Sequence, residues 1–252
     1  METQKKSRLD QLLAEHYGYE SRARARDAIL RGCIRLDGRV ATKPSQNANL
    51  NSTIEISDDA LRYVSRAALK LVHALKIEPL ALAGKTALDL GASTGGFTQV
   101  LLEQGIAKVF AIDVGSDQLH PSLQNDARII NIENLNARHL QRSDLNDERP
   151  DIVVSDLSFI SLKLALPPAL ELAAPGADGI FLIKPQFEVG KKGLGSGGIV
   201  RDEGLIKKTV QDLHDWLNQQ SGWQVLQIAP SPIEGGDGNK EFLMIARKNI
   251  TS

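Results

Sequence analysis

The sequence TALDLGASTGGFTQVLLEQG at residues 86–105 decides the fold class of this 252-residue chain. Five mostly apolar residues run into a glycine-rich turn, and apolar residues then recur at helical spacing. A strand, a glycine turn and a helix in this order are typical of a doubly wound sheet, in which ligands bind at the carboxyl ends of the strands. Because Asp89 lies at the end of the strand, we expect a ligand with a cationic or amine-bearing group beside it.

Strands and helices alternate through the rest of the chain. Most of the expected strands are continuous apolar runs, as in a sheet that helices cover on both faces. Only a loop separates the last two strands, so we expect the final strand to be antiparallel to its neighbour. The pattern predicts an α/β fold with a doubly wound, mostly parallel, seven-stranded sheet. The strands are expected at 86–90, 108–113, 127–132, 151–156, 179–184, 223–229 and 241–248, and the longest helices at 97–104, 162–174 and 203–219.

The first 60 residues have shorter elements and indicate a separate domain. Leucines recur at helical spacing in SRLDQLLAEHYG, and Ser21 is suited to cap a second helix. The pair Asp37-Gly38 between apolar residues predicts a tight hairpin. We therefore predict a small α+β domain at 1–60, a linker at 61–68 and the larger domain at 69–252.

The charges of the whole chain nearly cancel, with 30 Lys and Arg residues against 31 Asp and Glu residues. A uniformly basic coat is therefore excluded, whereas a local basic face is not. Cys33 is the only cysteine, so a reducing compartment is the simplest expectation. The first residues lack the apolar segment of a signal peptide, and no stretch has the roughly 18 apolar residues of a spanning helix. We expect a cytoplasmic protein without a membrane segment.

A local basic face lies in the first domain. Seven basic side chains between residues 21 and 43, against Asp27 and Asp37, give this segment a charge of +5. A solvated helix face is the simpler interpretation of such a run. Clustering on one compact helix–hairpin unit is, however, also the pattern of proteins that contact phosphate backbones.

The segment SRLDQLLAEHYGYESRARARDAILRGCIRLDGRVATKPS resembles the S4 RNA-binding domain. The matching features are the RLD start, the SR that opens the second helix, the LDGR turn and the KPS after it. The resemblance implies contacts with structured RNA, which proteins recognise mainly by shape and backbone. The RNA-binding residues that it implies are Arg8, Arg22, Arg26, Arg31, Arg35, Arg39 and Lys43.

The glycine turn fits neither of two common nucleotide sites. A dinucleotide site needs Gly-x-Gly-x-x-Gly, but Ser93 stands in place of the second glycine, and no Gly-Lys-Ser/Thr of a P-loop follows. A single Asp at a strand end is as often a cap or turn residue as a ligand contact. Here Asp89, the glycines and Asp113 fall at successive strand ends, and the pattern D-x-G-x-x-x-G-G-F resembles the first motif of Rossmann-like methyltransferases.

That resemblance implies S-adenosylmethionine (SAM) as the cofactor. Asp89 would lie near the methionine amino group, and Asp113 would accept hydrogen bonds from the ribose hydroxyls. Asn134 and Leu135 would contact adenine. The cofactor-binding residues that the resemblance implies are Asp89, Gly91, Ser93, Thr94, Gly95, Gly96, Phe97, Asp113, Val114, Asn134, Leu135 and Asp156.

Polar residues at other strand ends indicate the methyl acceptor. After the fourth strand the chain has SDLSF, whereas enzymes that methylate base amines carry an Asn/Asp-Pro-Pro-aromatic loop. Carbon methylation of a pyrimidine needs a cysteine near SAM, but Cys33 lies in the other domain. Taken singly, each lysine is more often part of a surface ion pair. Together, Lys70, Asp156, Lys184 and Glu241 resemble the Lys-Asp-Lys-Glu set of heat-shock-type, FtsJ-like ribose 2′-O-methyltransferases.

A ribose hydroxyl is a poor nucleophile while it keeps its proton. We expect Lys184 to position and deprotonate the 2′-hydroxyl, because burial and a second cation, Lys70, favour the neutral amine. Asp156 and Lys70 would hold the hydroxyl in line with the methyl group. The fourth and fifth strands are expected to adjoin the first, so that Asp156 and Lys184 flank that methyl group.

Nearly the whole chain is similar to the TlyA (hemolysin A-type) family of ribosomal RNA 2′-O-methyltransferases. The most specific stretches are YVSRAALKL, LDLGASTGGFT, AIDVG, NLNAR, SDLSFISL, IKPQFEVG and SPIEGGDGNKEFL. The resemblance implies methylation of a cytidine ribose in RNA of one or both ribosomal subunits. Relatives with dual activity often carry Arg-x-Trp-Val before Ser-Arg, where this chain has LRYV at 61–64, so the range of RNA targets stays open.

Two other classes of protein compete with this interpretation. A noncatalytic ribosome-assembly factor with the same fold would require a degraded SAM turn or Lys-Asp-Lys-Glu set. A membrane-lytic protein, which the family's historical name suggests, would need a long apolar or strongly amphipathic basic segment. The glycine-rich loop 188–203 is either a flap that offers Lys191, Lys192 and Arg201 to phosphate or a disordered excursion. The histidines show no ligand spacing, so no metal site is expected.

Overall fold

The computed structural model describes residues 6–236 and 238–250, and the chain divides into two compact units, Met1–Tyr63 and Val64–Ser252. The change from one unit to the other falls within the linker expected at 61–68. The domain limits 1–60 and 69–252 themselves stay predictions.

The first unit is built from two short helices and two small antiparallel sheets. Ser21 caps the second helix, because its Oγ accepts a hydrogen bond from the backbone N–H of Arg24 at 3.3 Å. Asp37 and Gly38 form the hairpin turn, and both have positive φ, as a tight turn of this kind requires. The elements are β1 (Ser7–Arg8), α1 (Leu9–His16), α2 (Arg22–Leu30), β2 (Ile34–Leu36), β3 (Arg39–Val40), β4 (Asn47–Ala48), β5 (Ile54–Ile56) and the 3₁₀ turn Asp59–Arg62.

Apolar side chains of these helices and strands form one core, which includes Leu9, Leu13, Ile29 and Ile34. β2 pairs with β3 and β5, and β1 pairs with β4. The β1–β4 pair is too short to leave a period-two pattern, so the sequence did not predict it.

The second unit carries a seven-stranded sheet with the order β11-β12-β10-β9-β6-β7-β8. β12 is antiparallel to both of its neighbours, and the other neighbouring strands of this sheet are parallel, which confirms the predicted fold class. One expectation was wrong, because β9 adjoins β6 but β10 lies one strand further out. The strands are β6 (Thr86–Leu90), β7 (Lys108–Ile112), β8 (Ile129–Ile132), β9 (Ile152–Ser155), β10 (Asp178–Ile183), β11 (Trp223–Pro230) and β12 (Phe242–Lys248).

Two of the three longest predicted helices agree with the structure to within one residue, and the third is divided. The helix expected at 162–174 is divided after Ala165, and Pro167 opens its second part, since proline lacks the N–H that a helix interior needs. The helices are α3 (Ala68–Ile77), α4 (Gly96–Glu103), α5 (Pro121–Gln124), α6 (Leu162–Ala165), α7 (Pro167–Leu172) and α8 (Glu203–Asn218). Short 3₁₀ turns lie at Ala137–His139, Arg142–Leu145, Pro185–Phe187, Lys191–Gly193 and Ser196–Gly198.

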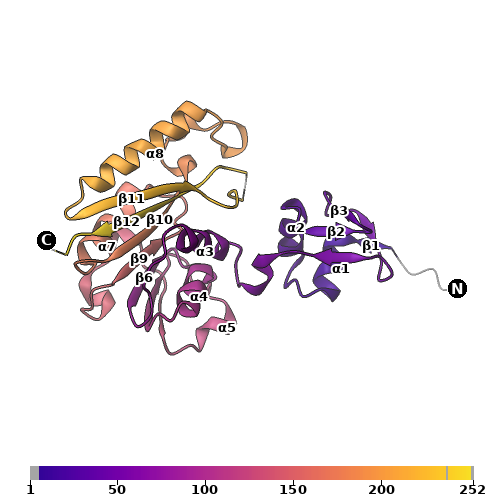
Figure 1. Ribbon diagram of the computed structural model, residues 1–252, viewed down its shortest axis with the longest axis horizontal. Helices are drawn as coiled ribbons and strands as arrows, with labels where there is room; N and C mark the ends of the chain where they lie inside the picture. Colours follow the sequence, from indigo (N-terminus) through magenta and orange to yellow (C-terminus); the bar gives the residue numbers. More distant parts are fainter. Residues whose placement is uncertain (1–5, 237, 251–252) are drawn as a thin grey trace. The chain divides into compact units, whose positions relative to one another are not determined.

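The alternation along β6 assigns its residues to opposite faces of the sheet. Leu88 and Leu90 belong to a buried cluster with residues of α6, α7 and α8, and Figure 1 shows α8 alongside β11. Asp89 faces the other side, where Thr98 of α4 contacts it. Both faces of β6 are therefore covered, and its carboxyl end is where side chains can meet a ligand. No helix in 6–236 or 238–250 combines the length and the hydropathy of a membrane span.

Candidate active site

The glycine turn after β6 needs glycine for its backbone conformation and for close packing. Gly91 and Gly95 have φ of +78° and +92°, which side-chain-bearing residues rarely adopt. A Cβ on Gly91 would lie 3.0 Å from the carbonyl oxygen of Asp156, and one on Gly95 would lie 2.5 Å from Leu123 Cδ1. Gly95 is also the residue before α4, so this turn fixes where the helix begins.

Asp89 is a buried carboxylate with one oxygen still available. Its Oδ2 accepts a hydrogen bond from Thr98 Oγ1 at 2.6 Å, whereas Oδ1 has no hydrogen-bond partner in the described part of the chain. Burial raises the pKa of Asp89 to about 7, and the hydrogen bond from Thr98 opposes that rise. A buried acceptor of this kind suits a cationic amine, so the residue fits the amino group of SAM.

Asp113 ties two loops at the sheet edge together. It follows β7, and its two carboxylate oxygens accept hydrogen bonds from the backbone N–H groups of Ser93 and Gly115, each at 2.8 Å. Asn134 N donates to the carbonyl of Gly115, and Leu135 N donates to that of Asp113, each at 3.1 Å. Because a carboxylate oxygen has two lone pairs, Asp113 keeps capacity for ribose hydroxyls.

Glu133 was missed by the sequence reasoning, although it shapes the same edge. Its carboxylate accepts hydrogen bonds from the backbone N–H groups of Asp117 and Gln118 at 2.7 and 3.2 Å. These bonds hold the segment after Val114, a predicted cofactor contact that is 69% exposed. A lone Glu after a strand leaves no signal in the sequence that would single it out.

The Lys-Asp-Lys-Glu cluster, which consists of Lys70, Asp156, Lys184 and Glu241, is assembled in one place. Asp156 lies between the two amines: Oδ1 is 2.6 Å from Lys184 Nζ and Oδ2 is 3.5 Å from Lys70 Nζ. Glu241 Oε2 is 2.7 Å from Lys70 Nζ. The contacts at 2.6 and 2.7 Å are ion pairs without the angles of hydrogen bonds. Lys184 Nζ also donates to Ser158 Oγ at 2.9 Å, a contact that the sequence reasoning missed.

The cluster is largely shielded from water. Lys70, Lys184 and Glu241 are each less than a tenth exposed. Burial alone would raise the pKa of Asp156, but the charges of Lys70 and Lys184 outweigh it and lower that pKa. Asp156 therefore stays ionised between the lysines at neutral pH.

The glycine turn and the Lys-Asp-Lys-Glu cluster border a common cavity of about 170 Å³. Asp156 and Lys184 line it from the cluster. From the turn and the start of α4 come Gly91, Ser93, Thr94, Gly96 and Phe97. A methyl donor held by the turn and an acceptor held by the cluster would thus meet in one space.

Several basic side chains of the first unit are held by acidic partners. Asp10 pairs with Arg8 at 2.9 Å and with Arg22 at 3.2 Å, and both arginines keep about half of their side-chain surface exposed. Arg31 differs, because it pairs with Asp27 at 2.7 Å and with Asp58 at 2.9 Å and is only 16% exposed. Arg31 therefore holds the end of α2 to Asp58, the residue before the 3₁₀ turn Asp59–Arg62, and its guanidinium is less open to a phosphate than those of Arg8 and Arg22.

The other predicted RNA-binding residues lie on the surface. Arg26, Arg39 and Lys43 are exposed, and no ion pair of theirs is seen among the described residues. Arg35 is also exposed, and its guanidinium donates to the carbonyl of Gly38 at 3.0 Å. These four side chains can reach a phosphate backbone without giving up a buried contact.

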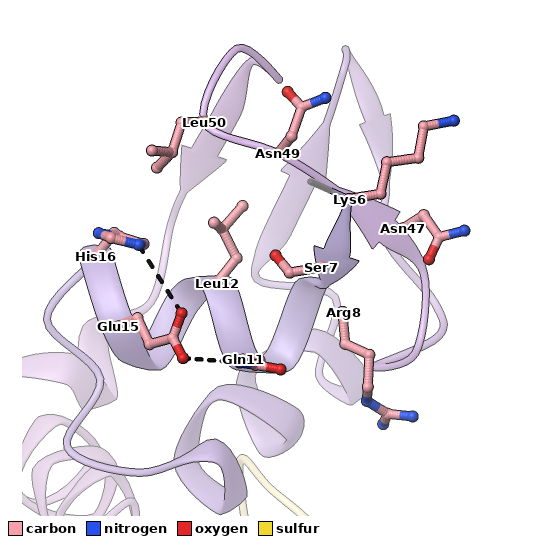
Figure 2. A pocket seen from close by; sticks show the side chains of 10 residues that line it. All are labelled: Lys6, Ser7, Arg8, Gln11, Leu12, Glu15, His16, Asn47, Asn49 and Leu50. Carbon is pink, nitrogen blue, oxygen red and sulfur yellow. Dashed lines mark hydrogen bonds and ion pairs between the residues drawn. The ribbon is translucent and has the colours of Figure 1, made fainter. Parts of the chain in front are cut away.

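A larger hollow of about 590 Å³ lies in the first unit, beside α1. Figure 2 shows Gln11 of α1 on one side and Asn47 and Asn49 of the β4 segment on the other. Lys6 and Arg8 add cations, and Leu12 adds an apolar contact. Glu15 also lines this hollow, and its carboxylate accepts a hydrogen bond from the Gln11 amide at 2.8 Å. Of the Lys-Asp-Lys-Glu cluster, Asp156 and Lys184 line the smaller cavity of the second unit, whereas Lys70 and Glu241 lie behind them.

The loop at 188–203 is a folded segment. Glu188 accepts hydrogen bonds from Ser161 Oγ at 2.6 Å and from the backbone N–H of Leu162 at 2.8 Å. Asn239 accepts from Val200 N at 3.0 Å. Lys191 and Arg201 are exposed, and the side chain of Lys192 lies outside the described part of the chain. Nowhere in the described ranges do three His, Cys, Asp or Glu side chains gather as metal ligands.

Two family models match the chain. Residues 63–248 match the FtsJ-like methyltransferase family, and residues 7–54 match the S4 domain. The 16S/23S rRNA (cytidine-2′-O)-methyltransferase TlyA of Mycobacterium tuberculosis is 42% identical over 96% of this chain and 90% of that protein. Hemolysin A of Brachyspira hyodysenteriae is 38% identical over 94% of this chain and 98% of its own length. A solved structure described as a "Putative hemolysin from Streptococcus thermophilus" has a TM-score of 0.75 and 35% identity, covering 97% of this chain and 89% of that one.

Proposed function

Because the chain belongs to the TlyA/hemolysin A family, with an S4 domain and an FtsJ-like methyltransferase domain, we propose that it methylates the ribose 2′-hydroxyl of a cytidine in ribosomal RNA. It is a SAM-dependent rRNA (cytidine-2′-O)-methyltransferase. The observation that carries this function is the position of Asp156, which contacts both lysine amines and lines the same cavity as the glycine turn.

Two strand ends of the second unit would hold SAM. Asp89 Oδ1 is a buried acceptor for the amino group, and Asp113 has acceptor capacity for the ribose hydroxyls. Asn134, Leu135 and Val114 would border the adenine. When bound, SAM supplies a methyl group on a positively charged sulfur, and the carbon–sulfur electron pair stays with sulfur when the ribose oxygen takes the methyl group.

Lys184 would receive the proton of the 2′-hydroxyl. It pairs with a single carboxylate, and it borders the cavity, whereas Lys70 pairs with two carboxylates. An oxygen that shares its proton with Lys184 carries more negative charge and attacks the methyl carbon more readily. Lys70 and Glu241 would keep Asp156 in place, and Asp156 would keep Lys184 in place.

The S4 domain would bring structured rRNA to this site. Arg26, Arg35, Arg39 and Lys43 are exposed for phosphate contacts, and the hollow beside α1 offers amides for exposed base edges. We propose intact ribosomal subunits as the substrate form, since shape and backbone recognition requires folded RNA. We propose the cytoplasm as its location, because ribosomal subunits would be its substrate.

Methyl transfer from tritium-labelled SAM to intact small and large subunits tests this function. The labelled RNA is digested to nucleosides, and the labelled nucleoside is identified by chromatography. We expect label in 2′-O-methylcytidine. Label on a base, or no transfer to either subunit, would contradict the proposed function.

A further inference from the structure

Ser158 contacts the Lys-Asp-Lys-Glu cluster without being part of it. It follows β9 by three residues, and it lines the cavity that Asp156 and Lys184 also line. Its hydroxyl accepts a hydrogen bond from Lys184 Nζ at 2.9 Å. The serine is therefore a direct neighbour of the amine that the proposed function makes the proton acceptor.

The two lysines of the cluster differ in the charge of their neighbours. Lys70 Nζ faces two carboxylates, Glu241 at 2.7 Å and Asp156 at 3.5 Å. Lys184 Nζ faces one carboxylate, Asp156 at 2.6 Å, and its second polar neighbour is the neutral hydroxyl of Ser158. Each nearby carboxylate favours the charged ammonium form, whereas a hydroxyl can accept a hydrogen bond from either form. The amine of Lys184 thus has one negatively charged neighbour fewer than that of Lys70.

A neutral amine has two N–H groups and one lone pair. Ser158 accepts one N–H of Lys184, and the Asp156 carboxylate lies against another side of the amine. All three residues line the cavity. A neutral Lys184 amine that is held by these two neighbours would keep its lone pair for a hydroxyl in the cavity.

We propose that Ser158 is a positioning residue that holds Lys184 toward the ribose hydroxyl without adding a second negative charge. This inference rests on the proposed function, because it assigns the proton to Lys184. The other groups that face Lys184 are Asp156 after β9, the aromatic ring of Phe187 at 5.9 Å and, through Asp156, Lys70 of α3 with Glu241 before β12.

Four variants separate charge from bulk. Ser158→Ala removes the hydrogen-bond acceptor, and Ser158→Thr keeps it. Ser158→Asp places a second carboxylate beside Lys184, so that both lysines of the cluster face two. Ser143→Asp is the matched control, because Ser143 is an exposed residue in the turn Arg142–Leu145, ahead of the amino end of β9.

The first measurement is the pH dependence of single-turnover methyl transfer to subunits at saturating SAM. We expect Ser158→Ala to lower the rate by roughly tenfold with unchanged affinity for SAM, and Ser158→Thr to restore most of it. Ser158→Asp should move the rise of the rate to a pH at least about one unit higher, because a carboxylate within about 4–6 Å favours the ammonium form. Ser143→Asp should leave the profile unchanged.

The second measurement needs no turnover. Protein carrying ¹³C at lysine Cε is titrated by NMR, and Lys184→Arg identifies the Lys184 signal. We expect the titration midpoint of Lys184 to lie at higher pH in Ser158→Asp than in the wild-type protein or in Ser143→Asp.

An unchanged midpoint in Ser158→Asp, or a wild-type rate and pH profile in Ser158→Ala, would overturn the role of Ser158. A wild-type enzyme that methylates no ribose would instead overturn the proposed function, and the NMR comparison still decides the electrostatic effect of residue 158.

Discussion

Asp89 makes SAM binding depend on pH in a range where few carboxylates titrate. Its side chain is fully buried, and burial raises its pKa to about 7. The cationic amine of SAM requires the ionised carboxylate, so below pH 7 a proton must leave before the cofactor binds. With a pKa of about 7, the apparent affinity should rise roughly fifteenfold between pH 5.5 and pH 7.0, while a free amino group with a pKa of about 7.7–8.0 stays mostly protonated.

The same burial should make Asp89 costly for stability above neutral pH. The folded-state pKa lies above the unfolded value of 3.8, so the stabilising contribution is complete below about pH 4 and is lost as the pH rises through 7. This difference of about three in pKa between the folded and unfolded states corresponds to a loss of roughly 4 kcal/mol in the free energy of unfolding at pH 8. Asp89→Asn removes this cost but leaves a buried amide group without a partner, which costs about 1–3 kcal/mol. We therefore expect the variant to unfold at higher urea concentration than the wild type at pH 8 and not at pH 5.

Calorimetric titration with SAM at several pH values measures the first effect, and urea denaturation at pH 5 and pH 8 measures the second. Asp89→Asn should bind SAM weakly at every pH, which makes it the control for titration of other groups. A wild-type affinity that does not change between pH 5.5 and 7.0, or an Asn variant that binds SAM as the wild type does, would refute the role given to Asp89.

Three further predictions concern stability and RNA binding. Lys248 is buried and its amine donates hydrogen bonds to three carbonyl groups at the end of α7, so Lys248→Met should lower the free energy of unfolding by about 2–4 kcal/mol in urea denaturation. Arg31→Ala leaves the buried carboxylate of Asp58 without its ion pair, so the first unit should melt at lower temperature in a circular dichroism scan. Arg39→Ala and Lys43→Ala should keep the wild-type melting temperature but weaken RNA binding in filter assays, and each should reduce the slope of log affinity against log salt by about 1.

The sequence predicts the sheet well because most of its strands are continuous apolar runs. All seven strands agree with their predicted bounds to within two residues, and the loop between the last two predicts the antiparallel β12. Short elements are harder to predict, since two residues of β1 and two of β4 carry no periodicity. The order of β9 and β10 relative to β6 depends on which strands pair, and a single sequence does not contain that information.

The candidate site also contains some residues that the sequence indicates and others that it does not. Residues whose type is unusual for their place, such as Asp89 before a glycine turn or Lys184 after an apolar strand, could be predicted from sequence. Ser158 and Glu133 could not, because their importance comes from hydrogen bonds whose partners depend on the fold. Arg31 differs from the other arginines of its segment in a way that the sequence does not indicate, because its side chain is held by Asp27 and Asp58.

The central claim is that Lys184, held by Asp156 beside the glycine turn, takes the proton of the ribose hydroxyl. The most direct test is the single-turnover rate of methyl transfer to subunits by Lys184→Ala, with SAM affinity measured on the same protein and Lys207→Ala, an exposed lysine of α8, as the control. The account predicts a rate at least about a hundredfold below wild type with SAM affinity nearly unchanged. A Lys184→Ala enzyme that forms 2′-O-methylcytidine at the wild-type rate would contradict it.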